Sequence, residues 1–165
     1  RGYDDLRRAG VIGQSPRIHA VQPEGNDTVA TPLREGATRA RPVDTSTTIS
    51  GLGVGFILDG HDVIRHAHDT GGTGFLIDED EIRAVQRRLA QEEGILVEPA
   101  GAVSVAGALA AAQEGRLSGP GPAICILTGH GFKDPVTLQT MGGDAVRIGR
   151  SDLAGTFRLQ EETAP

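Results

Sequence analysis

Strand-like and helix-like segments alternate along this chain of 165 residues, and this alternation limits the folds it can adopt. The clearest strand signal is at residues 123–128, where the run Ala-Ile-Cys-Ile-Leu-Thr is typical of a buried parallel strand. Shorter apolar segments at residues 18–22 and 74–77 predict two further strands. Because helical patterns lie between them, the sequence predicts an α/β fold with three layers, a mostly parallel sheet with helices on both faces.

Helices are expected at residues 2–9, 28–35, 61–68 and 102–113, and between Asp78 and Gly94. Asp78 and Glu81 form a capping-box-like start for the last of these. Three apolar residues then fall on one face of the helix: Ile82, Val85 and Leu89. In an open α/β sheet, ligands bind at the carboxyl ends of the strands, so the residues that follow each strand are the candidate site.

Composition excludes several classes of protein. The formal net charge is −6, which leaves no basic face for nucleic acid. A single cysteine, Cys125, fits a reducing compartment, and no apolar run has membrane length. We therefore expect a soluble cytoplasmic protein with no membrane or nucleic-acid partner. The chain starts with Arg1 inside a helical pattern without an N-cap, which predicts truncation of a longer protein.

Two motifs hold the candidate site residues. Thr128-Gly-His-Gly131 follows the strongest strand signal, where a hydroxyl can face a ligand and glycines let the backbone come close. Glu98 follows a short apolar segment in the same way. Its carboxylate could face a ligand, or it could cap the helix that follows, and both roles are compatible.

These motifs resemble strings found in threonine synthase and its relatives among the fold-type II pyridoxal-phosphate (PLP) enzymes. Residues 128–134 are similar to that family's Thr-Gly-His-Gly-Leu-Lys-Asp, with Phe132 in place of Leu. The segment that begins at Glu98-Pro-Ala-Gly-Ala is similar to its Glu-Pro-(Ser/Ala)-(Gly/Ala)-Ala. The resemblance covers roughly residues 1–135 and implies the C-terminal part of a PLP-dependent catalytic domain. Residues 136–165 are then a C-terminal extension, expected to be partly flexible.

The resemblance also implies roles for individual residues. The Thr128 hydroxyl would hydrogen-bond the pyridine nitrogen of PLP, with Gly129 beside it, and Glu98 would lie at the edge of the cofactor. Ser50 and Gly51 would belong to a loop that passes over one edge of the ring. The spacing Gly51-x-Gly-x-Gly alone is weak evidence for phosphate binding.

A PLP enzyme needs a lysine for its Schiff base, and Lys133 is the only lysine in the chain. The family places its catalytic lysine far upstream, so the resemblance implies that Lys133 is a surface or structural residue. The lysine and the phosphate-binding loop would then lie in a missing N-terminal half, and we expect this chain alone to be inactive.

Three functions follow as alternatives. The first is a threonine-synthase-like lyase, which converts O-phosphohomoserine and water to threonine and phosphate and works as a homo-oligomer. The second is another fold-type II enzyme, such as a threonine or serine dehydratase or a β-replacement amino-acid synthase. The third is a non-catalytic fragment that binds a partner chain. All but the third require a small amino-acid substrate.

Three histidines, His61, His66 and His68, form the remaining cluster. Their spacing does not place two imidazoles one helical turn apart on one face, as a zinc site on a helix requires. We expect a solvated helix face and no metal site, and we assign these histidines no role. No Gly-x-Ser-x-Gly motif is present, so a hydrolase triad is not supported.

Overall fold

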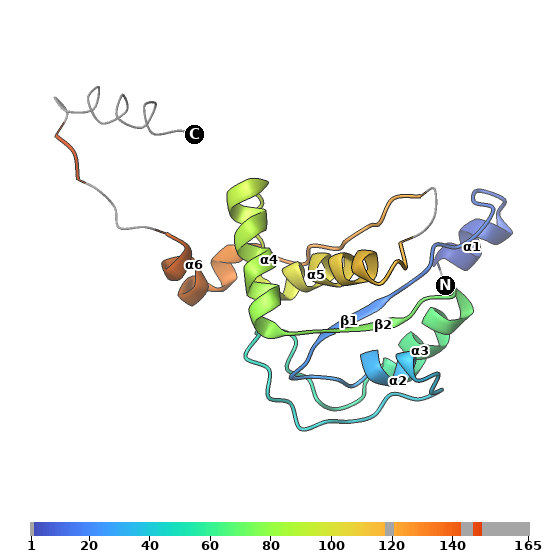
Figure 1. Ribbon diagram of the computed structural model, residues 1–165. Helices are drawn as coiled ribbons and strands as arrows, with labels where there is room; N and C mark the ends of the chain where they lie inside the picture. Colours follow the sequence, from blue (N-terminus) through green and yellow to red (C-terminus); the bar gives the residue numbers. More distant parts are fainter. Residues whose placement is uncertain (1, 118–120, 143–146, 150–165) are drawn as a thin grey trace. The chain divides into compact units, whose positions relative to one another are not determined.

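The computed structural model describes residues 2–117, 121–142 and 147–149 of the chain. Its strands β1 (Ala20–Pro23) and β2 (Gly74–Ile77) pair in parallel, with Ala20 opposite Gly74 and Pro23 opposite Ile77 (Figure 1). β2 lies where the sequence predicts it, and β1 begins at Ala20 rather than at residue 18. Parallel neighbours need a long crossover connection, and the segment that holds the next two helices supplies it.

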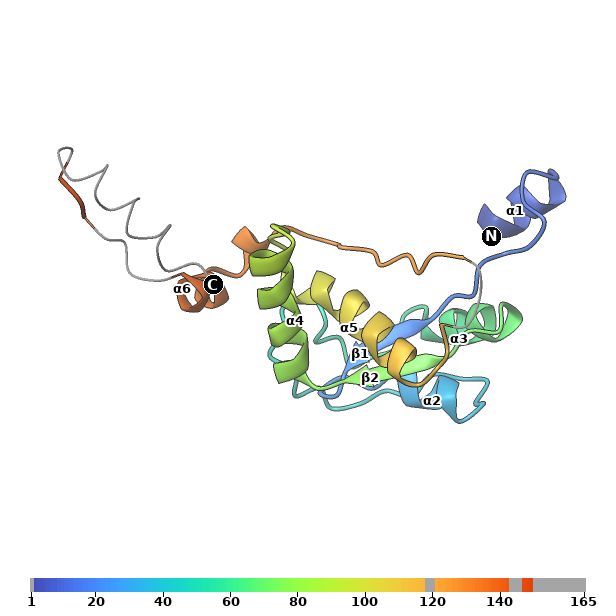
Figure 2. The ribbon, with the colours of Figure 1, turned by 45° about the horizontal axis from the view of Figure 1, so that its top comes forward.

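Helices cover both faces of the paired strands (Figures 1 and 2). On one face lie α2 (Ala30–Arg34) and α3 (Gly60–Asp69), with a core of Val29, Leu33, Ala40, Ile64 and Ala67. On the other lies α5 (Pro99–Gln113), with α4 (Glu79–Glu92) packed against it, and this core includes Phe75, Ile77, Ile82, Val103 and Ala106. The predicted three-layer α/β fold with parallel strands is therefore confirmed.

Close packing between α5 and β1 depends on Gly107. A Cβ atom at this position would overlap the side chain of Val21. The absence of a Cβ at Gly107 therefore makes room for the Val21 side chain of β1. The small residues of α5 thus bring the helix down onto the strands, because no larger side chain holds it away.

The start of α4 agrees with its sequence pattern. Asp78 is the N-cap, and its carboxylate accepts hydrogen bonds from the backbone N–H groups of Asp80 (2.9 Å) and Glu81 (3.2 Å). Ile82 and Val85 are buried, as predicted. α5 starts at Pro99, earlier than the expected residue 102, because proline is well suited to the first turn of a helix.

The expectation of a buried parallel strand at residues 123–128 is wrong. This segment forms no strand, and Ile124 and Ile126 are 81% and 71% exposed. It runs along α5, where the Ser104 hydroxyl donates a hydrogen bond to the carbonyl of Ile126 (3.0 Å). The physical reason is that a strand needs a neighbour for its backbone groups, and none of the described strands lies beside it.

The chain divides between Pro135 and Val136 into two units. The first unit also contains α1 (Gly2–Arg8), which buries no side chain and is followed by Gly10 at a positive φ of 71°. α6 (Pro135–Met141) leads into the second unit and contains a hydrogen bond from the Thr140 hydroxyl to the carbonyl of Thr137 (2.8 Å). The flexibility expected for residues 136–165 concerns mostly residues outside the described part. None of the described helices is both long and apolar enough to cross a membrane.

Candidate cofactor site

Two segments that are distant in sequence meet at the start of α5. The backbone N–H of Glu98 donates to the carbonyl of Gly129 (3.0 Å), and that of Gly131 donates to the carbonyl of Leu96 (3.0 Å). Val97 and His130 form an isolated antiparallel bridge between these bonds. The two predicted motifs are thus held together by backbone hydrogen bonds, even though neither follows a strand.

The Glu98 carboxylate is the centre of this meeting point. It accepts a hydrogen bond from the Thr128 hydroxyl (3.0 Å) and lies 3.4 Å from the Lys133 ammonium nitrogen. The Glu98 side chain is 14% exposed, whereas that of Lys133 is 66% exposed. Glu98 is the N-cap residue of α5, but its carboxylate accepts no capping hydrogen bond. The predicted capping role thus holds by position at the helix N-terminus and not through a hydrogen bond, while the role beside a cofactor stays a prediction.

Gly129 must be glycine for this contact to form. A Cβ atom at this position would overlap the Glu98 carboxylate and would lie 2.7 Å from the Lys133 Nζ atom. At Gly101, in the first turn of α5, a Cβ atom would lie 2.5 Å from the Val97 side chain and 3.1 Å from the Thr128 backbone nitrogen. The two glycines thus let the Thr128 segment approach the start of the helix.

The loop that contains Ser50 and Gly51 reaches the same end of α5. Ile49 is buried in the core beside this helix, with 2% of its surface exposed. The two residues after it, Ser50 and Gly51, are exposed. Gly51 adopts a positive φ of 87°, which disfavours other residues. A Cβ atom built there would lie 4.0 Å from that of Ala100. All five predicted residues (Ser50, Gly51, Glu98, Thr128 and Gly129) therefore gather around the start of α5.

Asn26 and Glu79, which the sequence motifs did not indicate, hold this loop. Asn26 is buried, and its amide nitrogen donates to the carbonyls of Leu52 and Val54 (3.1 Å to the latter). Its own amide oxygen has no hydrogen-bond partner among the residues that the structure describes. Glu79 in α4 accepts hydrogen bonds from the backbone N–H (3.0 Å) and the hydroxyl (2.6 Å) of Thr48. The position of Asn26 just after β1 was the signal that could have identified it.

The three histidines of the cluster lie in α3, and two of them make hydrogen-bond contacts with the segment after α2. His61 Nδ1 accepts a hydrogen bond from the Ala40 backbone N–H (3.0 Å), and His68 Nε2 lies 3.2 Å from the carbonyl of Ala37. These two histidines therefore fasten α3 to the segment after α2, rather than only facing solvent as expected. His66 lies beside Arg65 on the exposed side of the helix.

Comparison with known proteins gives a consistent result. A family model described as "Pyridoxal-phosphate dependent enzyme" matches residues 5–129. Threonine synthase from Methanosarcina acetivorans is 30% identical over 84% of this chain and 34% of its own length. Threonine synthase from Methanocaldococcus jannaschii is 30% identical over 90% of this chain and 37% of its own length. The chain thus spans about a third of the length of the curated relatives it matches.

Solved structures agree on the fold. Maize serine racemase superposes with a TM-score of 0.56 and 26% identity, covering 75% of this chain and 37% of the racemase chain. O-ureido-L-serine synthase with bound O-ureido-L-serine has a TM-score of 0.51 and 21% identity, covering 99% and 52%, and supports the fold alone. The match of the family model over residues 5–129, together with the α/β layers around the start of α5, shows that the chain belongs to the pyridoxal-phosphate dependent enzyme family and is similar to its threonine synthases.

Proposed function

We propose that this chain is the C-terminal part of a threonine-synthase-like lyase, which converts O-phosphohomoserine and water to threonine and phosphate. The observation that carries the proposal is the contact between Thr128 and Glu98 at the start of α5. It joins the two motifs by which the chain resembles threonine synthases, and threonine synthases are among its relatives. A cytoplasmic location and a homo-oligomeric assembly belong to the same proposal.

The residues around this contact fit a flat cofactor such as PLP. Thr128 is exposed, so its hydroxyl can turn from Glu98 and donate its hydrogen to the ring nitrogen of a bound cofactor. Gly51 carries no side chain, and an added Cβ there would come no nearer than 4.0 Å to Ala100, which leaves space at the surface by the start of α5. When bound, PLP supplies the electron sink for breaking bonds at the substrate Cα. Thr128 would then orient the ring, while Ser50 and Gly51 would border one of its edges.

The choice of a hydroxyl at this position has a chemical consequence. A neutral hydroxyl leaves a pyridine nitrogen largely unprotonated, because it offers no negative charge to stabilise the protonated form. The electron sink is then weaker than one paired with a carboxylate. Elimination and replacement of groups at Cβ and Cγ suit such a sink better than transamination. Glu98 weakens the hydrogen bond from Thr128 to the ring nitrogen, since its carboxylate competes for the single hydroxyl hydrogen of Thr128.

The lysine that carries the cofactor would come from the remainder of the enzyme. Lys133 is the only lysine of this chain, and its ammonium group already lies in an ion pair with Glu98. Neutralising Lys133 for nucleophilic attack would leave the partly buried Glu98 carboxylate without its cation. We propose that this chain is inactive without the remainder of the enzyme. We also infer that this remainder is the protein partner that the chain binds.

A substrate assay tests the proposal. The chain is combined with the remainder of the enzyme, on the same polypeptide or added separately, and supplied with PLP. We expect phosphate release from O-phosphohomoserine in equal amounts with threonine. Formation of 2-oxo acids from serine or threonine, without phosphate release, would instead support the dehydratase alternative. Absence of any turnover or cofactor binding would favour a non-catalytic partner-binding role.

A further inference from the structure

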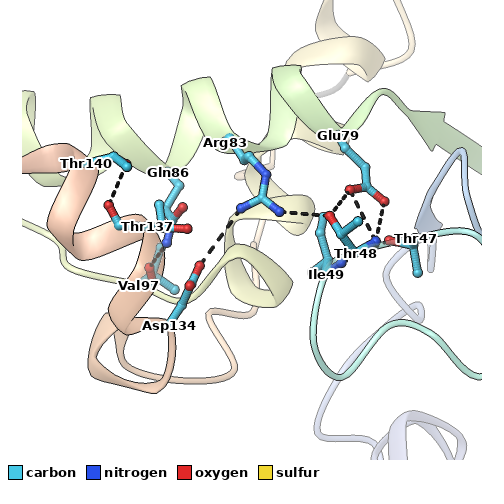
Figure 3. Close-up of polar contacts among 10 residues, drawn as sticks. All are labelled: Thr47, Thr48, Ile49, Glu79, Arg83, Gln86, Val97, Asp134, Thr137 and Thr140. Atoms are coloured by element: carbon cyan, nitrogen blue, oxygen red, sulfur yellow. Dashed lines mark hydrogen bonds and ion pairs between the residues drawn. The ribbon is translucent and has the colours of Figure 1, made fainter.

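One face of α4 carries three polar residues that together contact three segments of the candidate site (Figure 3). Glu79, Arg83 and Gln86 are spaced i, i+4 and i+7, so they form a stripe along the helix. The stripe borders the apolar face that contains Ile82 and Val85. α4 itself holds none of the predicted cofactor residues, and the proposed function assigns it no role.

The first two residues of the stripe hold the loop before Ser50. The Thr48 hydroxyl donates to Glu79 Oε2 (2.6 Å) and accepts from Arg83 Nη2 (3.0 Å). It therefore lies between a carboxylate and a guanidinium group of the same helix. Glu79 also accepts from the backbone N–H of Thr48 (3.0 Å). Partial burial opposes the charge of Glu79, but hydrogen bonds from Thr47 and Thr48 and the nearby Arg83 lower the pKa of this carboxyl below its usual value.

The same arginine and the next stripe residue reach the other two segments. Arg83 Nη1 lies 3.9 Å from a carboxylate oxygen of Asp134, which ends the turn that follows Thr128 and Gly129. The amide nitrogen of Gln86 donates to the carbonyl of Val97 (2.9 Å), the residue directly before Glu98. Gln86 is 1% exposed, so this hydrogen bond is shielded from water.

We propose that the stripe of Glu79, Arg83 and Gln86 is a positioning element that sets the spacing of the three segments of the cofactor site. Each segment is a loop or turn, and such segments hold a fixed position only when a rigid element supports them. A single helix that contacts all three fixes their spacing, because the distances along a helix cannot change. The proposal rests on the cofactor site proposed above.

The test uses variants of both partners of one stripe contact, the hydrogen bond between Arg83 and Thr48. They are made in the assembled enzyme that contains this chain. Thr48→Val removes the hydroxyl from an exposed loop residue without changing the side-chain shape, and Arg83→Gln removes the guanidinium group. Arg88→Gln is the matched control, since Arg88 lies on the same helix and pairs only with Glu92 by an exposed i, i+4 contact in the described part of the chain. Unfolding temperatures of all variants are measured in parallel.

Cofactor affinity is the first readout, measured by the fluorescence of bound PLP. We expect Thr48→Val and Arg83→Gln each to weaken binding by about 10- to 150-fold, as loss of one hydrogen bond to a charged group would. The double variant should lose less affinity than the product of the two single losses, because both changes remove the hydrogen bond between Arg83 and Thr48. Arg88→Gln should bind PLP like the unaltered protein. Unchanged affinity in Thr48→Val and Arg83→Gln, or equal weakening in Arg88→Gln, would overturn the proposal.

Amide hydrogen exchange without PLP is the second readout, and it separates the stripe from the proposed function. We expect Arg83→Gln to speed exchange in residues 47–52 and 129–134 by about tenfold, with the core of α5 unchanged. Faster exchange in both segments supports the stripe even if the protein binds no PLP, in which case only the proposed function fails. Unchanged exchange in both segments overturns the stripe, whatever the cofactor result. Arg83→Lys, which keeps the charge, should recover only part of the protection.

Discussion

At the scale of single residues, Thr128 is the group on which the proposed cofactor site depends. Thr128→Val keeps the side-chain shape and removes the hydroxyl, so both Glu98 and the ring nitrogen lose a partner. We expect PLP affinity or turnover in the assembled enzyme to fall by about 5- to 150-fold, the loss that one buried hydrogen bond predicts. Cofactor titration and steady-state kinetics measure it. If both quantities stay intact, Thr128 is only a turn residue.

Gly129 offers a second test at this scale. In Gly129→Ala, the new methyl group would overlap the Glu98 carboxylate, so the contact between Glu98 and Thr128 must break. We expect cofactor affinity to fall by at least about tenfold, because the two motifs would separate. Gly121→Ala is the matched control, since a Cβ at Gly121 meets no atom within 4 Å. Equal affinities in the two variants would show that the contact is not needed.

At the scale of elements, α4 and α3 differ in how they start. The Asp78 carboxylate caps α4 with two hydrogen bonds, whereas Asp59 is the N-cap of α3 and makes no side-chain capping bond. We expect Asp78→Ala to lower the free energy of unfolding by about 1 kcal/mol, and Asp59→Ala to lower it by clearly less. Urea unfolding followed by circular dichroism compares them. A larger loss in Asp59→Ala would contradict the capping geometry.

At the scale of the whole molecule, the segment with Ile124 and Ile126 exposes apolar surface that we expect the remainder of the enzyme to cover. Replacing both with serine should weaken association with that remainder by about 100-fold or more, since burying each isoleucine stabilises the complex by roughly 1.5–3 kcal/mol. The stability of this chain alone should change little. Leu58→Ser, at a position 71% exposed on another surface, is the control for association. Light scattering and titration calorimetry follow the binding. Unaltered association in the double variant would place the interface elsewhere.

Some features follow from the sequence by local physics. The strand at Gly74–Ile77, the Asp78 cap and the buried face with Ile82 and Val85 depend on nearest neighbours and on burial periodicity. The grouping of Glu98 with Thr128 came from the resemblance of their strings to one family. In each case the signal lies within a few residues, or in a motif that keeps its spacing.

Tertiary structure alone decided the rest. The apolar run at residues 123–128 has the composition of a strand but forms none here, because strand formation depends on a neighbouring backbone that composition does not specify. The sequence did not predict the stripe of α4, because only the fold brings its partners to one face of the helix. These partners are Thr48, Val97 and Asp134. The sequence by itself determined the layers and the candidate cofactor residues, and the fold decided which contacts hold those residues in place.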